Sequence, residues 1–218
     1  MSKLDVLERI RACGVLPVIR AASSNDGRKV VDAIVEGGID TIEVTMTVPG
    51  AIALIAELVK SFGDKLVIGA GTVMDAETAR ECIAAGAQFI VSPATNFDTI
   101  LYCNEAQVLV MPGALTPTEV ANAWEAGADV VKVFPANAMG GPSYLRSLKA
   151  PLPSIKLIPT GGVDQSNAAE FIRAGAEAVG VGADLVDVRS VTEGRAGVVT
   201  ESAKKYLQIV RNARTQAA

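Results

Sequence analysis

The sequence contains no histidine, so any acid–base chemistry must come from carboxylates, lysine, tyrosine, cysteine or water. It has only three cysteines, Cys13, Cys82 and Cys103, which are scattered and form no CxxC pair. A zinc site is therefore not expected, whereas a magnesium site built from carboxylates stays open. Scattered cysteines in odd number also argue against a disulfide framework and indicate reduced thiols in a cytoplasmic protein.

Long apolar runs and an excess of positive charge are also missing. No run reaches the length of a transmembrane helix, and the charged N-terminus lacks the apolar segment of a signal peptide. The formal net charge is −4 at pH 7. Because nucleic-acid binding needs a basic surface, we expect neither a nucleic acid nor a membrane as a partner.

Aromatic residues are scarce, at 4% of the chain, although hydrophobic residues make up 50%. A core of alanine, valine, isoleucine and leucine suits a parallel sheet that is covered by helices. Short apolar runs alternate with helical segments at about the spacing of one βα unit. The predicted strands are residues 15–20, 41–44, 66–70, 88–91, 108–111, 130–134, 156–159 and 178–181.

The helical segments carry recognisable start and stop signals. Glycines at 37–38, 86, 127 and 175 end the helices that precede the second, fourth, sixth and eighth strands. The segment Thr116-Pro-Thr-Glu119 has the pattern of a capping box. A doubled βαβα unit, repeated four times around a closed barrel, produces this phase of glycines.

The sequence therefore predicts an α/β protein, a (β/α)8 TIM barrel that forms a single domain over residues 1–218. An extra N-terminal helix is expected at residues 1–13 and a frayed tail at residues 213–218. An open doubly wound sheet is the alternative. Eight strands are many for such a sheet, and no GxGxxG motif follows the first strand.

Lys132 lies inside residues 128–136, an apolar, β-branched run that predicts a buried strand. Burying an ammonium group is costly unless the group is paired or deprotonated. A neutral amine is a nucleophile that can form a Schiff base with a ketone or an aldehyde. A structural ion pair with Glu43 is the alternative, but both residues are expected at the C-terminal ends of strands, where barrel active sites lie.

Three other polar residues end or follow predicted strands. Arg20 ends the first strand, Thr72 follows the third, and Thr160 follows the seventh. Polar groups in apolar strands are costly, so their convergence with Glu43 at one end of the barrel indicates a functional site. The alternatives are a surface ion pair for Arg20 and hydrogen bonds to the main chain for the threonines.

Glycine-rich loops follow the last two predicted strands, at Pro159-Thr-Gly161-Gly162 and at residues 180–185. In many barrels these two loops bind phosphate, because glycine lets main-chain N–H groups approach the anion closely. The alternative is that the glycines only shape tight turns.

Seven motifs are spread over nearly the whole chain: Leu16-Pro-Val-Ile-Arg20, Ile42-Glu-Val-Thr45, Gly69-Ala-Gly-Thr72, Val91-Ser-Pro93, Lys132-Val-Phe-Pro135, Pro159-Thr-Gly-Gly162 and Gly180-Val-Gly-Ala-Asp-Leu185. In combination they resemble the bacterial 2-keto-3-deoxy-6-phosphogluconate (KDPG) aldolase family. That family includes 4-hydroxy-2-oxoglutarate (KHG) and 2-keto-3-deoxy-6-phosphogalactonate aldolases. The resemblance implies a cytosolic homotrimer that uses neither a metal nor a cofactor.

The resemblance also assigns roles to individual residues. Lys132 becomes the Schiff-base lysine and Glu43 the general acid and base. The substrate-binding residues that it implies are Arg20 and Thr72 at the pyruvate end, Pro93, Phe134 and Thr160 around the pyruvate pocket, and Gly161, Gly162, Gly182 and Ala183 as main-chain donors to the phosphate.

Two positions depart from the family pattern. Thr47 stands where some members have an arginine that holds the carboxylate, so this role passes to Arg20, as in members with the same Thr-Val-Pro segment. Ala183 stands where many phosphate-using members have a serine, which removes one hydroxyl donor. An unphosphorylated substrate therefore stays open.

The predicted function is that of a lyase, a class I aldolase that cleaves KDPG to pyruvate and glyceraldehyde 3-phosphate. The same chemistry on KHG, on 2-keto-3-deoxy-6-phosphogalactonate or on an unphosphorylated 2-keto-3-deoxy sugar acid is the nearest alternative. A phosphate-barrel isomerase or epimerase with Glu43 as base, and a binding barrel without turnover, are the other two. In each case the partner is a small molecule.

Overall fold

The computed structural model describes residues 1–215, which form a parallel α/β fold. Every strand pair is parallel, as a core of small aliphatic side chains predicts. The strands are β1 (Val15–Ile19), β2 (Thr41–Thr45), β3 (Val67–Gly71), β4 (Phe89–Val91), β5 (Leu109–Met111), β6 (Gly113–Ala114), β7 (Val131–Val133), β8 (Leu157–Pro159) and β9 (Val179–Val181).

The strands lie in two sheets with the orders β5-β4-β3-β2-β1-β9 and β6-β7-β8. The division falls at Pro112, a residue without an N–H group, so the fifth predicted strand continues as the short segment β6. The carbonyl of Pro112 still accepts a hydrogen bond from the Lys132 N–H at 2.9 Å. Isolated bridges join Leu157 to Ala176 and Thr160 to Gly180, so the layer curls like a TIM barrel.

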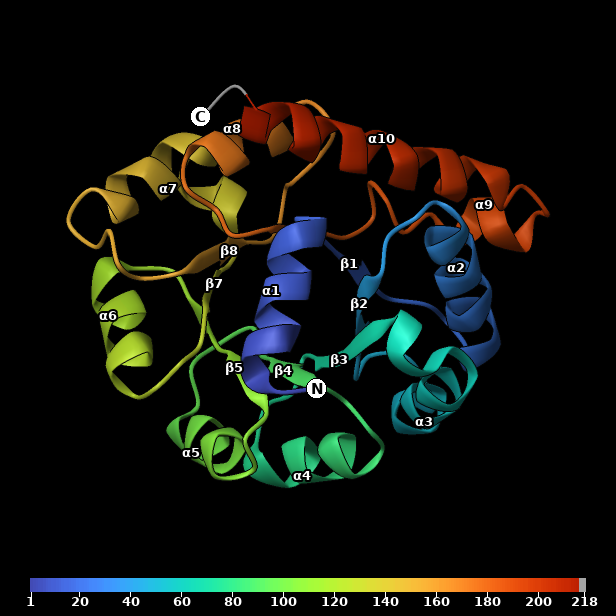
Figure 1. The fold of residues 1–218 in the computed structure, drawn as a ribbon, viewed down its shortest axis with the longest axis horizontal. Helices are drawn as coiled ribbons and strands as arrows, with labels where there is room; N and C mark the ends of the chain where they lie inside the picture. The colour runs from blue at the N-terminus through green and yellow to red at the C-terminus, as the bar shows by residue number, and fades with distance from the viewer. Residues whose placement is uncertain (216–218) are drawn as a thin grey trace.

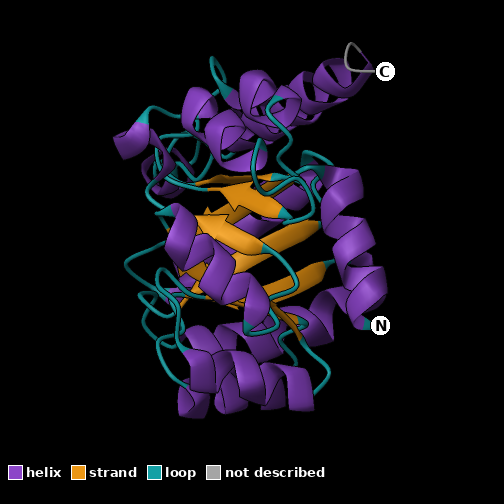
Figure 2. Cartoon of the chain, turned by 90° about the vertical axis from the view of Figure 1, so that its left-hand side faces the viewer, coloured by secondary structure: helices purple, strands orange, loops and turns teal. Residues whose placement is uncertain are grey.

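The helices surround this curled layer of strands (Figures 1 and 2). The predicted capping box is confirmed at the start of α6, where the side chain of Thr116 accepts from the N–H of Glu119. The helices are α1 (Lys3–Cys13), α2 (Ser24–Glu36), α3 (Ala51–Phe62), α4 (Ala76–Ala84), α5 (Phe97–Glu105), α6 (Pro117–Glu125), α7 (Pro142–Lys149), α8 (Ala168–Arg173), α9 (Val188–Thr192) and α10 (Gly197–Thr215), with 3-10 turns η1 (Gly63–Lys65) and η2 (Ala136–Met139).

Helix α1 closes one end of the curled layer, and Figure 1 shows it in front of the strands. Its buried residues Val6, Leu7 and Ile10 belong to one core cluster with residues from the beginnings of the strands, including Leu16 and Val67. A second, larger cluster fills the space between strands and outer helices. Because α1 covers the N-terminal ends of the strands, a ligand site must open at their C-terminal ends.

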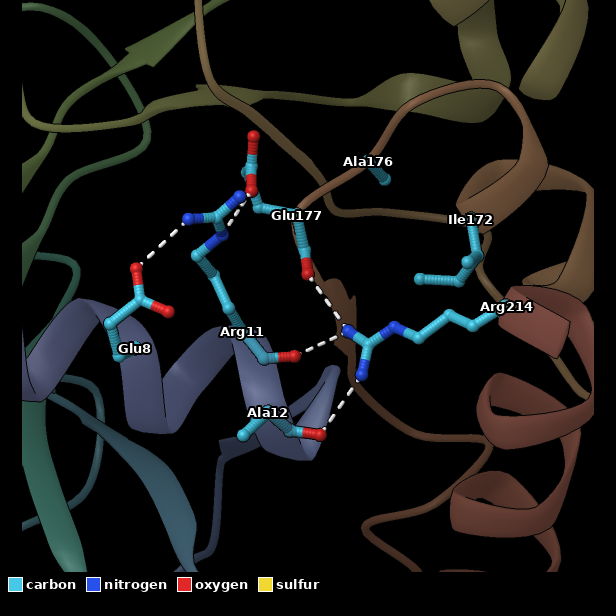
Figure 3. Close-up of a pocket in the computed structure, with 7 residues that line it drawn as sticks. All are labelled: Glu8, Arg11, Ala12, Ile172, Ala176, Glu177 and Arg214. Atoms are coloured by element: carbon cyan, nitrogen blue, oxygen red, sulfur yellow. Dashed lines mark hydrogen bonds and ion pairs between the residues drawn. The ribbon is translucent and has the colours of Figure 1, made fainter. Parts of the chain in front are cut away.

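The C-terminal segment is more ordered than the sequence predicts. The helix continues through Thr215, so the expectation of a frayed segment is wrong for residues 213–215, and residues 216–218 lie outside the described part of the chain. Ala213 is fully buried, and the guanidinium of Arg214 donates to main-chain carbonyls of α1 (Figure 3). No helix among residues 1–215 is long and apolar enough to cross a membrane.

Candidate active site

The structure brings Lys132 and Glu43 together inside the curled layer. Lys132 lies on β7 and Glu43 on β2, and Lys132 Nζ is 3.6 Å from Glu43 Oε1. The lysine side chain is 5% exposed and the glutamate side chain 2%. Two ionisable groups are buried here against a desolvation cost, which is typical of a functional site.

One oxygen of this pair is unsatisfied. Among the described residues, Glu43 Oε1 is the only buried side-chain nitrogen or oxygen without a hydrogen-bond partner. The distance of 3.6 Å to Lys132 Nζ allows an ion pair but is too long for a good hydrogen bond. An unpaired buried acceptor is costly, so this oxygen is suited to a hydroxyl group or a water molecule held beside the amine.

Glycines on the strands beside the pair allow close packing around it. A Cβ atom at Gly71, on β3, would lie 2.0 Å from Glu43 Oε1. A Cβ atom at Gly113, which is in register with Lys132, would lie 2.2 Å from the main chain of Pro93. Gly71 lies in the motif Gly69-Ala-Gly-Thr72, of which only Thr72 was expected at the site.

Phe134 follows Lys132 on the same face of the chain, and its ring centroid is 5.4 Å from Lys132 Nζ. Its N–H donates to the carbonyl of Ala114 at 3.0 Å. The N–H of Thr160 donates to Val133 at 3.0 Å, and the Thr160 carbonyl accepts from Ala136 at 2.9 Å. These bonds join the ends of β7 and β8, so Lys132, Phe134 and Thr160 are held in fixed relative positions.

Most of the predicted substrate-binding residues line one pocket of about 360 Å³. Pro93 lies instead in a neighbouring pocket of about 320 Å³, and Phe134 lines both. Thr72 lines neither pocket. It follows Gly71 directly, with a φ of 58°, a strained conformation for a β-branched residue. The predicted residues that share the larger pocket are Arg20, Phe134, Thr160, Gly161, Gly162, Gly182 and Ala183.

Unpaired main-chain N–H groups occur in the two glycine-rich loops. The N–H groups of Gly162, Ala183 and Asp184 donate no hydrogen bond to any described residue. Gly162 has a φ of 74°, which glycine adopts without strain. Because all three residues line the larger pocket, this pocket presents several free donors to an anion.

Thr47, the position that departs from the family pattern, is linked to the end of β1 through Thr45. Its Oγ1 lies 2.6 Å from Thr45 Oγ1, and the Thr45 hydroxyl donates to the carbonyl of Ile19 at 2.9 Å. Arg20 follows Ile19 directly, is exposed, and enters the larger pocket. The hydrogen bonds of Thr45 and Thr47 therefore stabilise the end of β1, next to Arg20.

Two carboxylates that the sequence did not assign to the site, Asp164 and Asp184, line the larger pocket. The Asp164 side chain accepts hydrogen bonds from the N–H groups of Ser166 and Asn167, so its carboxylate is bound to its own loop. The Asp184 side chain accepts from the hydroxyl of Tyr206 on α10. Burial, then the contact with Asp184, raises the pKa of Tyr206 above its usual range, so the hydroxyl stays protonated and donates.

The sequence matches the model of a known family, KDPG and KHG aldolase, over residues 6–202. The chain belongs to this family. Among residues 1–215, no group of three or more histidine, cysteine, aspartate or glutamate side chains is placed to hold a metal ion.

Curated and solved relatives cover nearly all of this KDPG and KHG aldolase family member. A 2-dehydro-3-deoxy-phosphogluconate aldolase of Treponema pallidum is 35% identical over 94% of this chain and 96% of its own. A 2-dehydro-3-deoxy-6-phosphogalactonate aldolase of Escherichia coli is 34% identical over 90% and 96%. The crystal structure of Legionella pneumophila KDPG aldolase, with pyruvate captured as a covalent carbinolamine, is 29% identical over 91% and 96%, with a TM-score of 0.84.

Proposed function

We propose that this protein is a class I aldolase that cleaves KDPG to pyruvate and glyceraldehyde 3-phosphate. The observation that carries the proposal is the buried pair of Lys132 and Glu43, with a carboxylate oxygen that no described protein group satisfies. The family match and the carbinolamine in the Legionella pneumophila relative support it.

The reaction begins with attack of the neutral Lys132 amine on the C2 ketone of the substrate. Loss of water from the carbinolamine gives an iminium, which can accept the electrons of the neighbouring bond. Glu43 removes the C4 hydroxyl proton, directly or through a water molecule, and the C3–C4 bond breaks. The aldehyde leaves, and the C3 carbon stays as an enamine of pyruvate on Lys132.

The enamine carbon then takes up a proton, and water hydrolyses the iminium to release pyruvate and the free lysine. A single carboxylate can serve these steps, because the group that accepts a proton in one step can donate it in another. The unpaired Oε1 of Glu43, 3.6 Å from the lysine nitrogen, is suited to each of these transfers.

Substrate binding divides between the two ends of the site. The paired N–H donors of Arg20 suit the planar carboxylate of the pyruvate end. The phosphate would lie against free main-chain N–H groups of the glycine-rich loops. Such N–H groups can bind an anion without a positively charged side chain. The remaining residues assigned to the site are Thr72, Pro93, Phe134 and Thr160 around the pyruvate unit, and Gly161, Gly162, Gly182 and Ala183 at the phosphate.

The same chemistry on a different sugar acid is the second candidate function. Ala183 lacks a hydroxyl donor at the phosphate end, and one close relative is named a phosphogalactonate aldolase. Comparison of kcat/KM for KDPG, its C4 epimer and the unphosphorylated acid separates these substrates. Equal values for the phosphorylated and unphosphorylated acids would show that the glycine-rich loops contribute no phosphate binding.

We also propose that the curled layer is a closed (β/α)8 barrel and that the protein is a cytoplasmic homotrimer. Counting β5 and β6 as one strand interrupted at Pro112 gives eight positions around the layer. A surface that could be covered by a second copy carries exposed apolar side chains after β3 and β4: Met74 is 51% exposed, and Phe97 and Leu101 are each 58% exposed. Light scattering of the purified protein tests the trimer.

The decisive activity test measures pyruvate release from KDPG, with glyceraldehyde 3-phosphate as the second product in equal amount. Wild-type protein should release both, whereas the Lys132→Ala variant should fold and release neither. Release of pyruvate by the variant at the wild-type rate would contradict the Schiff-base assignment. Absence of release by folded wild-type protein from KDPG, its C4 epimer and the unphosphorylated acid would leave isomerisation or binding without turnover as the function.

A further inference from the structure

Asp184 places a carboxylate at the end of the site that we assign to the phosphate. It directly follows Ala183, whose N–H group is one of the free donors, and both residues line the pocket that contains Arg20. A carboxylate that turned into this pocket would repel a phosphate and compete for the same N–H donors. The loop therefore needs a contact that controls where Asp184 lies.

Tyr206 supplies this contact from the closing helix α10. Its side chain is 0% exposed and belongs to the main core cluster, so its position is fixed by packing. Its hydroxyl donates to Oδ2 of Asp184. Burial keeps this hydroxyl protonated, because it raises the pKa of Tyr206 above the usual range.

The loop at residues 182–185 has no other side-chain hydrogen bond among the described residues. Its remaining internal contacts are main-chain bonds, in which the Gly182 carbonyl accepts from Leu185 at 3.0 Å and from Val186 at 2.8 Å. These bonds form a turn but leave the N–H groups of Ala183 and Asp184 free. Leu185 anchors the far end of this turn in the core, and the hydroxyl of Tyr206 supplies the side-chain hydrogen bond that holds Asp184.

We propose that Tyr206 is a positioning residue for the phosphate end of the site and acts through Asp184. By holding the Asp184 carboxylate against α10, it keeps the negative charge away from the bound anion and fixes the N–H groups of Ala183 and Asp184 toward it. The inference rests on the proposed function, since it concerns how the same site binds its phosphorylated substrate.

The test compares Tyr206→Phe with the wild-type protein. The variant keeps the ring in the core and removes only the hydroxyl. We expect the KM for KDPG to rise about tenfold, equivalent to about 1.4 kcal/mol, with kcat little changed. The KM for unphosphorylated 2-keto-3-deoxygluconate and the yield of borohydride-trapped pyruvate should stay at the wild-type values, because neither involves the phosphate.

A matched control is Tyr144→Phe. Tyr144, on α7, also loses one hydroxyl hydrogen bond in this variant, the bond to the carbonyl of Leu115 at 2.5 Å, and it lies outside the pocket that contains Arg20. This control should lose stability without a selective change in the KM for KDPG. A selective rise in Tyr144→Phe as well would contradict a specific role for Tyr206.

A second variant, Asp184→Ala, breaks the same contact at an exposed position, so the test does not depend on the folding of Tyr206→Phe. Tyr206→Phe should weaken the binding of inorganic phosphate, measured by calorimetry, more than Asp184→Ala does, because only Tyr206→Phe leaves a released carboxylate beside the anion. The double variant should bind phosphate as Asp184→Ala does, because the hydroxyl of Tyr206 acts only through the Asp184 carboxylate. Additive losses in the double variant would overturn the proposal.

Equal rises in KM for the phosphorylated and unphosphorylated acids would also overturn it, because Tyr206 would then act on the whole fold. Failure of the proposed function gives a different result. In that case wild-type protein cleaves neither acid, whereas failure of this inference leaves cleavage of KDPG intact and only removes its selective dependence on Tyr206.

Discussion

At the residue scale, the chemistry depends on one buried carboxylate that the described protein groups do not fully satisfy. Glu43 Oε1 has the Lys132 ammonium or amine at 3.6 Å and no hydrogen-bond donor. A buried oxygen without a hydrogen bond lowers the stability of the fold, so a catalytic role explains this arrangement better than a structural one. The glycine at position 71 has the same explanation, since any side chain there would overlap with Glu43.

The variant Glu43→Gln tests this assignment. The amide keeps the shape of the side chain but cannot take up a proton, so kcat should fall about 10²- to 10⁴-fold while the KM changes much less. Steady-state kinetics with KDPG, accompanied by circular dichroism to verify the fold, provides the measurement. A large increase in KM with an unchanged kcat would mean that Glu43 only positions the substrate.

Lys132 and Glu43 could be predicted from the sequence because each interrupts a short apolar strand. The assignment of Arg20 came from family resemblance, and the structure places this residue in the pocket with the glycine-rich loops. Asp184 could not be predicted as part of the site, because its partner Tyr206 is 22 residues away on another element. Sequence spacing carries no signal for such a contact.

At the scale of the elements, apolar runs and glycine stops predicted the positions of the strands well. Pro112 was not recognised as an interruption, although its missing N–H group divides the strand into β5 and β6. The expectation of a frayed tail at residues 213–218 does not hold for the end of α10. The helix continues to Thr215 because Ala213 is buried and Arg214 donates hydrogen bonds to α1. Such tertiary contacts cannot be predicted from the local sequence.

Arg214 joins the last helix to the first, and this contact should contribute to stability rather than to catalysis. Its guanidinium donates to the carbonyls of Arg11, Ala12 and Glu177, at the end of the strands opposite to Lys132 (Figure 3). Since hydrogen bonds from charged donors contribute about 1.5–3 kcal/mol, Arg214→Ala should lower the free energy of unfolding by about 2 kcal/mol. The kcat and KM should not change.

Denaturant unfolding and the KDPG assay provide this measurement, and Arg211→Ala is the matched control. Arg211 is an exposed arginine on the same helix, so its removal should change the free energy of unfolding by less than about 0.5 kcal/mol. Equal stability of Arg214→Ala and Arg211→Ala would show that the contacts at the end of α1 contribute nothing.

At the scale of the whole molecule, burial of the cysteines should make the folded protein less stable at alkaline pH. Burial raises the pKa of Cys82 from 9.0 to about 11 and that of Cys103 from 9.0 to about 12. The unfolded chain therefore releases these protons first. The stabilisation is complete below pH 9 and is lost as the pH rises from 9 toward these folded-state values.

We expect the free energy of unfolding to fall between pH 8 and 10.5, as measured by urea denaturation at each pH. Cys103→Ala should show a smaller fall than wild-type protein over this interval, because one of the buried thiols with a raised pKa is absent. Lysine titration affects both proteins equally and cancels in the comparison. Parallel curves for the two proteins would contradict the contribution from Cys103.

The closed end of the strands also determines where the reaction can take place. Helix α1 closes the N-terminal ends of the strands, so the reaction is confined to the opposite end, where Lys132, Glu43 and the free N–H donors lie. Composition predicted the parallel α/β architecture, because a core of small aliphatic residues with few aromatics suits little else of this length. It could not predict the imine chemistry, which depends on the environment of a single nitrogen.

Borohydride reduction in the presence of pyruvate, followed by peptide mass spectrometry, tests that chemistry most directly. Reduction converts an iminium into a stable secondary amine, so one pyruvate-derived group should be found on the peptide that contains Lys132 and on no other lysine. Lys132→Ala should give no adduct under the same conditions. Folded wild-type protein without an adduct, or with the adduct on another lysine, would contradict the Schiff-base mechanism proposed for this site.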